Sequence, residues 1–185
     1  MSTLPSHAVM SMGLAPLVLG RGVKGWILAL GAGVAMLPDL DVIAFRFGIP
    51  YGHPLGHRGF SHSLLLAALA GLITYGLARW RRFHASERLS LFIFLAMASH
   101  GVLDAMTSGG RGVGFFIPFS DARYFFPWRP IRVSPFGMTW LFSARGLAVM
   151  LSELQWVWLP ALGFALMGWM LHRSFRHDPE PARLP

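Results

Sequence analysis

Long apolar segments separated by short polar stretches dominate the chain. A bilayer core of about 30 Å is crossed by about 20 apolar residues in a helix, with a range of about 17–25. The segments that approach or meet this length are 9–20, 25–37, 61–78, 89–106 and 154–171. Pro160 falls inside the last of them, where we expect it to kink the helix rather than end it. The pattern therefore predicts an all-α, polytopic membrane helical bundle of about five membrane segments.

The stretch 109–136 differs in kind, because it is rich in Gly, Pro, aromatic residues and Arg and has no helical period. Its prolines, which block long helices, are Pro118, Pro127, Pro130 and Pro135. One interpretation is a long surface loop whose rings lie among lipid headgroups. The other is a lid or substrate cradle whose arginines pair with phosphate.

Composition supports a single membrane domain. Hydrophobic residues make up 54% of the 185 residues and charged residues only 13%, about half the usual share in a soluble domain. We assign residues 1–176 to one integral-membrane domain and expect 177–185 to be a disordered polar tail. Cysteine is absent, so any metal must be bound by nitrogen and oxygen ligands.

The net charge of +8 does not indicate a nucleic-acid partner, because the basic residues cluster between apolar segments. With five crossings, nine of them fall on one side and seven on the other, and the positive-inside rule makes the richer side cytoplasmic. Those nine are Arg21, Lys24, Arg79, Arg81, Arg82, Arg88, Arg173, Arg176 and Arg183. The pattern predicts a multi-pass membrane protein with this basic side in the cytoplasm.

Seven ionisable side chains fall at the other, non-cytoplasmic ends of these segments. They are His7, Asp39, Asp41, His57, His62, His100 and Asp104. Ionisable groups at membrane depth are costly and usually face a partner, an ion or a water-filled cavity. Imidazole and carboxylate are metal ligands. We therefore predict a metal site at the non-cytoplasmic face of the membrane.

His100 and Asp104 have i, i+4 spacing, which places both side chains on one helix face within reach of one ion. The alternative is a His–Asp hydrogen bond that joins two helices. In HRGFSHS, His57 and His62 can converge only if the first lies in a turn before the helix, with Ser61 as a candidate N-cap.

Asp39 and Asp41 follow Pro38 directly, and an extended or turn segment could point both carboxylates to one side. The alternative is a helix stop followed by an N-cap, which one Asp would satisfy. His7 alone carries little information and gains value only from its predicted side, while we interpret His53 as a turn residue. The histidines interpreted as ordinary loop residues of the basic side are His84, His172 and His177.

A metal bound to these ligands would lower the pKa of water to about 7. Asp39 or Asp41 could then take the proton, while Arg58 and an arginine of the long loop stabilise developing charge. A lipid or lipid-linked phosphate is the substrate that the location favours. The main alternative is a non-enzymatic metal-binding transporter or sensor, although the candidates gather at one face without an inverted repeat. A structural scaffold with a buried polar network is a third interpretation.

The motifs AMLPDLDV, YGHPLGHRGFSHS and SHGVLDAMTSGG, in this order, resemble a bacterial inner-membrane family of metal-dependent hydrolases that includes YbcI and YdjM. The likeness covers most of the chain, and the motif residues of that family fall on the seven candidates above. The family is similar in its His/Asp pattern to the helical zinc-dependent phospholipase C and P1-nuclease group. This resemblance implies a phosphoester hydrolase with a divalent metal, zinc or manganese. The soluble relatives use an N-terminal Trp as a ligand; its absence here implies one or two ions rather than three.

Overall fold

The computed structural model describes residues 1–134 and 142–174, and these residues form helices and no β-strand. The α-helices are α1 (Leu4–Leu19), α2 (Gly25–Met36), α3 (Leu64–Trp80), α4 (Ser86–Ala105), α5 (Ala144–Glu153) and α6 (Leu159–Ser174). Two 3₁₀ helices, η1 (Leu37–Phe47) and η2 (Phe60–His62), and a π turn, η3 (Leu154–Trp158), complete them. The all-α prediction is confirmed. The expected polar tail, together with Pro135, lies outside the described residues.

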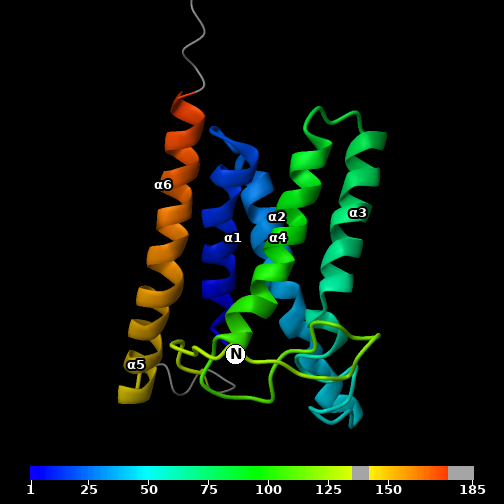
Figure 1. Cartoon of the computed structure of the whole chain (residues 1–185), viewed down its shortest axis with the longest axis vertical. Helices are drawn as coiled ribbons and strands as arrows, with labels where there is room; N and C mark the ends of the chain where they lie inside the picture. The colour runs from blue at the N-terminus through cyan, green and yellow to red at the C-terminus, as the bar shows by residue number, and fades with distance from the viewer. Residues whose placement is uncertain (135–141, 175–185) are drawn as a thin grey trace, which may run out of the picture.

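Three helical runs are long and apolar enough to cross a membrane: Gly25–Phe47, Ser86–Ala105 and Ala144–Arg173. The first joins α2 to η1, and the last joins α5, η3 and α6. Two shorter apolar helices, α1 and α3, pack beside them (Figure 1). This arrangement agrees with the expected bundle of about five membrane segments.

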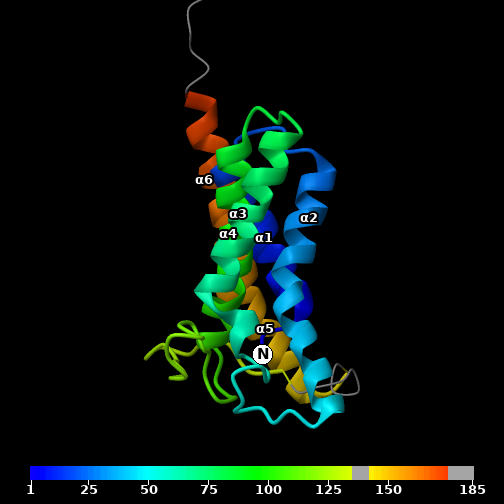
Figure 2. The ribbon, with the colours of Figure 1, turned by 90° about the vertical axis from the view of Figure 1, so that its right-hand side faces the viewer.

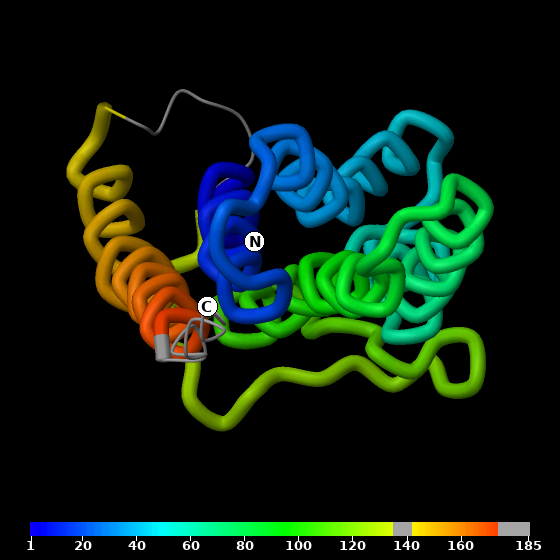
Figure 3. Tube along the Cα trace, turned by 90° about the horizontal axis from the view of Figure 1, so that it is seen from above, coloured from blue at the N-terminus to red at the C-terminus, as the bar shows by residue number. Residues whose placement is uncertain are grey.

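Two helices hold the bundle together. α1 contacts α2, α4 and α6, while α4 contacts α1, α2 and α3 (Figure 3). The α1–α2 and α3–α4 turns and the end of α6 lie at one end of the bundle, and the N-terminus, η1, η2 and the long loop lie at the other (Figures 1 and 2). The basic turns therefore share one end, as the charge pattern predicts, and the candidate ligands share the opposite one.

Pro38 does not stop the second segment, contrary to the expectation from sequence. The helix continues past Met36 as η1, with Pro38 in the first turn of the 3₁₀ helix. Proline is tolerated there because the Leu37 N–H donates to the Val34 carbonyl oxygen, which an N–H at position 38 would bond in a regular α-helix. The extended or turn geometry expected for Asp39 and Asp41 is consequently wrong, since both residues lie on a 3₁₀ helix.

Two other boundaries differ from expectation. Ser63, rather than Ser61, caps α3, and its hydroxyl accepts a hydrogen bond from the Leu66 N–H at 3.1 Å. The last membrane helix begins well before residue 154, because α5 runs into α6 through the π turn η3. The helix continues through Pro160, which confirms that this proline does not end it. The π turn η3 lies directly before Pro160 and changes the backbone hydrogen-bond pattern there.

The long loop lies across the end of the bundle that carries η1 and η2 (Figure 1). Its chain folds back on itself, with isolated backbone pairing between Val113 and Tyr124. Arg123 fixes it to the preceding turns by donating to the carbonyl oxygens of His57 and His53, each at 3.0 Å. This arginine is therefore engaged with backbone.

The α1–α6 interface depends on the absence of a side chain at Gly168. A Cβ atom there would lie 2.4 Å from the backbone nitrogen of Leu17, so the helices could not keep their spacing. We expect Gly168→Ala to lower the free energy of unfolding by about 1–3 kcal/mol, the usual cost of overpacking. Gly163→Ala on the same helix is the matched control, because a Cβ atom there meets nothing within 4 Å. Equal stability of the two variants in detergent would contradict the close packing.

Candidate metal centre

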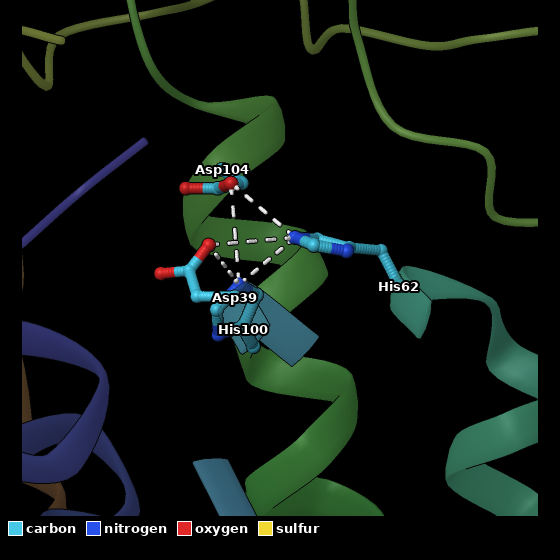
Figure 4. Close-up of side chains that lie close together, drawn as sticks. All are labelled: Asp39, His62, His100 and Asp104. Carbon is cyan, nitrogen blue, oxygen red and sulfur yellow. Dashed lines mark hydrogen bonds and ion pairs between the residues drawn. The ribbon is translucent and has the colours of Figure 1, made fainter. Parts of the chain in front are cut away.

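Four buried side chains from three elements meet at the end of the bundle opposite the basic turns. They are Asp39 of η1, His62 of η2, and His100 and Asp104 of α4 (Figure 4). Each offers one ligand atom, and these atoms all lie within 4.8 Å of one another. All four residues are at most 4% exposed. Segments far apart in the sequence thus deliver nitrogen and oxygen donors to one point.

The contacts within this four-residue cluster centre on two imidazole nitrogens. His100 Nε2 lies 3.0 Å from His62 Nε2 and 3.4 Å from Asp39 Oδ1. His62 Nε2 lies 3.6 Å from Asp104 Oδ2 and 3.9 Å from Asp39 Oδ1. The i, i+4 pair on α4 closes the group, with His100 Nε2 at 4.0 Å from Asp104 Oδ2.

Hydrogen bonds on the far side of each ring fix which nitrogen carries the proton. His100 Nδ1 lies 2.7 Å from the carbonyl oxygen of Ala35, which can only accept, so Nδ1 donates and Nε2 of the neutral ring is a lone pair. The hydrogen bond of His62 Nδ1 is with the Ser61 hydroxyl at 2.9 Å, and because that hydroxyl donates its own proton to Asp41 Oδ2, Nδ1 donates here too. Two nitrogen lone pairs therefore face each other beside two carboxylates, an arrangement that requires a cation.

The protonation of His62 shows the same requirement. Burial lowers its pKa, but the interactions with Asp104 and Asp41 outweigh burial and raise the pKa to about 9. In the metal-free protein this group thus takes up a proton, and a metal ion would take the proton's place.

The carboxylates themselves provide a test of fit. Among the described residues, neither buried oxygen of Asp39 has a hydrogen-bond partner, and the buried Oδ2 of Asp104, which the Arg58 guanidinium contacts at 2.9 Å, accepts no other hydrogen bond. Buried polar atoms are nearly always hydrogen-bonded, so such atoms call for an ion or a water molecule. Imidazole nitrogens with carboxylate oxygens suit zinc, and they also accept manganese. The residues present therefore fit a divalent metal.

Asp41 lies on the other side of His62 and belongs to a second group, formed with His57. Its Oδ1 lies 2.6 Å from His57 Nδ1, and its Oδ2 accepts from the Arg58 N–H at 3.0 Å and from the Ser61 hydroxyl at 2.5 Å. Both oxygens of Asp41 are thus engaged by protein donors, and through its contacts with the two Nδ1 atoms Asp41 orients the rings of His57 and His62. Such a carboxylate behind a ligating imidazole is usual in metal sites.

The 3₁₀ geometry of η1 explains the separate positions of the two carboxylates. With three residues per turn, side chains two apart point about 120° away from each other around the axis. Asp39 therefore faces Nε2 of His62 while Asp41 faces Nδ1. The shared orientation expected from an extended segment is not seen.

His7 closes the cluster from α1. Its ring stacks on His100 with centroids 3.6 Å apart, and its Nε2 lies 3.8 Å from both Asp39 and Asp104. It is fully buried. His53, in contrast, is exposed and accepts a hydrogen bond from the Leu55 N–H, in keeping with the predicted turn.

Arg58 is fully buried and its guanidinium contacts protein groups. Nε lies 2.9 Å from Asp104 Oδ2, and the two terminal nitrogens donate to Gly109 O and to Thr107 Oγ1, each at 3.0 Å. Its backbone φ of 62° is unusual for a residue other than glycine. The surroundings hold it there, and the side chain fixes Asp104 and the start of the long loop.

Two polar residues near the cluster, Ser2 and Glu153, were not predicted from the sequence. The Ser2 N–H donates to Asp104 Oδ1 at 2.9 Å. Glu153 is fully buried and accepts from the Thr3 N–H at 2.6 Å and from the Ser6 hydroxyl at 2.7 Å, which anchors the start of α1. An acidic residue in an apolar helix is a signal that could have identified Glu153. No comparable signal marks Ser2.

Comparisons with known proteins identify an inner-membrane family. The profile of the family described as YdjM inner membrane protein matches residues 1–177. The inner membrane protein YbcI of Escherichia coli (strain K12) is 42% identical over 179 residues, which cover 94% of this chain and 99% of YbcI. No solved structure matches significantly. The chain therefore belongs to the YdjM inner membrane protein family.

Proposed function

We propose that the chain is a membrane-bound, metal-dependent hydrolase that acts on a phosphoester of a lipid or lipid-linked substrate. The observation that carries this proposal is the buried His/Asp cluster, in which both oxygens of Asp39 lack a hydrogen-bond partner among the described residues. The similarity of its His/Asp pattern to zinc-dependent phospholipases adds support. By the positive-inside rule, the cluster would lie at the non-cytoplasmic face of the inner membrane.

One divalent ion, zinc or manganese, would be held by Asp39, His62, His100 and Asp104, with His7 at its edge. Such an ion supplies Lewis acidity and a water of lowered pKa. The second group, around Asp41, is already joined by a 2.6 Å contact to His57, which favours one ion over two.

The protein's own residues would divide the remaining work. Asp39 would offer to the ion its Oδ1, the oxygen nearest the His62 and His100 nitrogens, and its Oδ2 is then the better candidate for the general base. Neither oxygen has a hydrogen-bond partner among the described residues, whereas Asp41 accepts from several donors. Arg58 would act by holding Asp104 rather than by touching the phosphate.

An amphiphilic substrate fits the surroundings of the cluster. The long loop beside it exposes large aromatic side chains, with Phe119 81% and Trp128 56% exposed. It also exposes Arg111, a donor suited to phosphate. These aromatic rings and this arginine would lie among the lipid headgroups, where they could contact the phosphate and the adjoining apolar part of a lipid.

A second candidate, a metal-binding transporter or sensor without catalytic activity, is favoured by one observation. The cluster is at most 4% exposed, so the ion is enclosed by protein. Hydrolysis would require part of this cover to move aside, whereas structural or sensory metal binding would not.

Purified protein loaded with zinc or manganese is expected to hydrolyse phosphoesters, with amphiphilic substrates preferred over soluble ones. His62→Ala should abolish turnover, while His84→Ala, at the basic end, should retain it. Asp39→Asn and Asp41→Asn distinguish ligand from base, because a variant that lacks only the base keeps its metal and loses turnover. If no phosphoester in a broad lipid panel is cleaved, yet metal crosses liposomes in a His62-dependent way, the second candidate replaces the first.

A further inference from the structure

An apolar groove runs along the outside of the bundle between α1 and α6. It consists of two adjoining cavities of about 670 Å³ and about 400 Å³, which share Met12 and Ala165 in their walls. The larger cavity opens toward the basic end, where Arg21 and Trp169 line it. The smaller cavity reaches Leu154 and Trp158.

The groove is long enough for a lipid chain. Its walls on η3 and α6 extend from Leu154 to Trp169, and a helix rises about 1.5 Å per residue, so the groove is about 22 Å long. One leaflet contributes about half of the roughly 30 Å hydrocarbon core. An acyl chain that enters from the basic end can therefore lie along the groove over the whole depth of its leaflet.

Two arginines lie beside Trp169, which lines the groove at its basic end. The guanidinium carbons of Arg21 and Arg173 each lie 5.2 Å from the ring centroid of Trp169. Both side chains are exposed, and they come from different elements, the α1–α2 turn and the end of α6. Both positive charges lie beside the same ring, so an anion bound there would be attracted to both.

The backbone leaves room for a headgroup between these charges. Gly20 and Gly22, on either side of Arg21, adopt positive φ values of 88° and 74°, which favour glycine. No atom lies within 4 Å of where a Gly22 Cβ would be. A phosphodiester fits here, because arginine forks bind phosphate oxygens and the indole packs against the glycerol region.

We propose that this groove binds an anionic phospholipid, with its phosphate at Arg21 and Arg173 and one acyl chain against Met12 and Ala165. The headgroup end of this site, at Arg21, lies at the opposite end of the bundle from the four-residue cluster. It is therefore independent of the metal and of any hydrolysis there.

The test is a native mass spectrometry titration of the full chain in detergent with dioleoyl phosphatidylglycerol and dioleoyl phosphatidylcholine. Each arginine beside an anionic headgroup contributes about fivefold in affinity, so we expect phosphatidylglycerol to bind roughly 25-fold more tightly. R21Q/R173Q should remove most of this preference. R79Q/R81Q is the matched control, because Arg81 also stacks on an indole, that of Trp80 at 5.1 Å, and lies at the same end.

A second variant tests the groove apart from the charges. Ala165→Phe fills the wall shared by both cavities, so it should weaken both lipids severalfold while the preference for phosphatidylglycerol persists. Thermal unfolding without lipid checks that each variant is folded. Equal affinity of the native chain for the two lipids, or equal loss in the R79Q/R81Q control, would overturn the headgroup site. Unchanged binding in Ala165→Phe would overturn the groove.

Discussion

Replacing His100 with alanine is expected to lower the affinity for zinc by more than about 100-fold. Its Nε2 lies 3.0 Å from His62 Nε2 and 3.4 Å from Asp39 Oδ1, two other candidate ligand atoms. Its Nδ1 proton is fixed by the hydrogen bond to the Ala35 carbonyl oxygen. Loss of a residue that merely orients a ligand costs about 10–100-fold in affinity, so loss of a ligand held this rigidly should cost more. Asp104→Ala should have a comparable effect.

The measurement is competition with a chelator of known affinity, on protein without a histidine tag. His84→Ala and His172→Ala are the controls, because both residues lie at the basic end of the bundle. They should bind zinc like the native chain. Equal losses in all four variants would mean that zinc binds non-specifically to histidines, and the cluster would then hold no specific ion.

Much of this site can be predicted from the sequence because membrane topology is a strong constraint. Once the apolar segments are counted, the positions of Lys and Arg set the side of every polar residue. The helical period alone predicts that His100 and Asp104 share one helix face, and the structure places both in the four-residue cluster. His7, uninformative alone, is brought there by the same argument.

The predictions that were wrong depend instead on local backbone geometry and on contacts between residues far apart in the sequence. Pro38 signals a helix stop in most sequences, yet here it begins a 3₁₀ helix that turns Asp39 and Asp41 to different faces of His62. The role of Arg58 depends on a positive φ and on Thr107, which lies 49 residues away in sequence. No periodicity encodes such contacts.

Arg58→Ala is expected to destabilise the metal-free protein by about 3–5 kcal/mol, the usual cost of removing one partner of a buried ion pair. Asp104 would keep a buried charge without its 2.9 Å guanidinium partner. Unfolding in mixed detergent micelles measures the free energy. Arg111→Ala, at an exposed arginine of the long loop, is the control and should change stability by no more than about 0.5 kcal/mol.

The double variant R58A/D104A separates this ion pair from a general packing defect. If the arginine acts mainly by neutralising Asp104, the combined cost should fall below the sum of the single costs by about 0.5–3 kcal/mol. Zinc should also rescue Arg58→Ala, because an ion bound beside Asp104 replaces the missing positive charge; zinc at 100 times its Kd adds about 2.7 kcal/mol. Strict additivity together with no rescue by zinc would show that Arg58 supports the long loop alone, and Asp104 would then need another explanation for its buried charge.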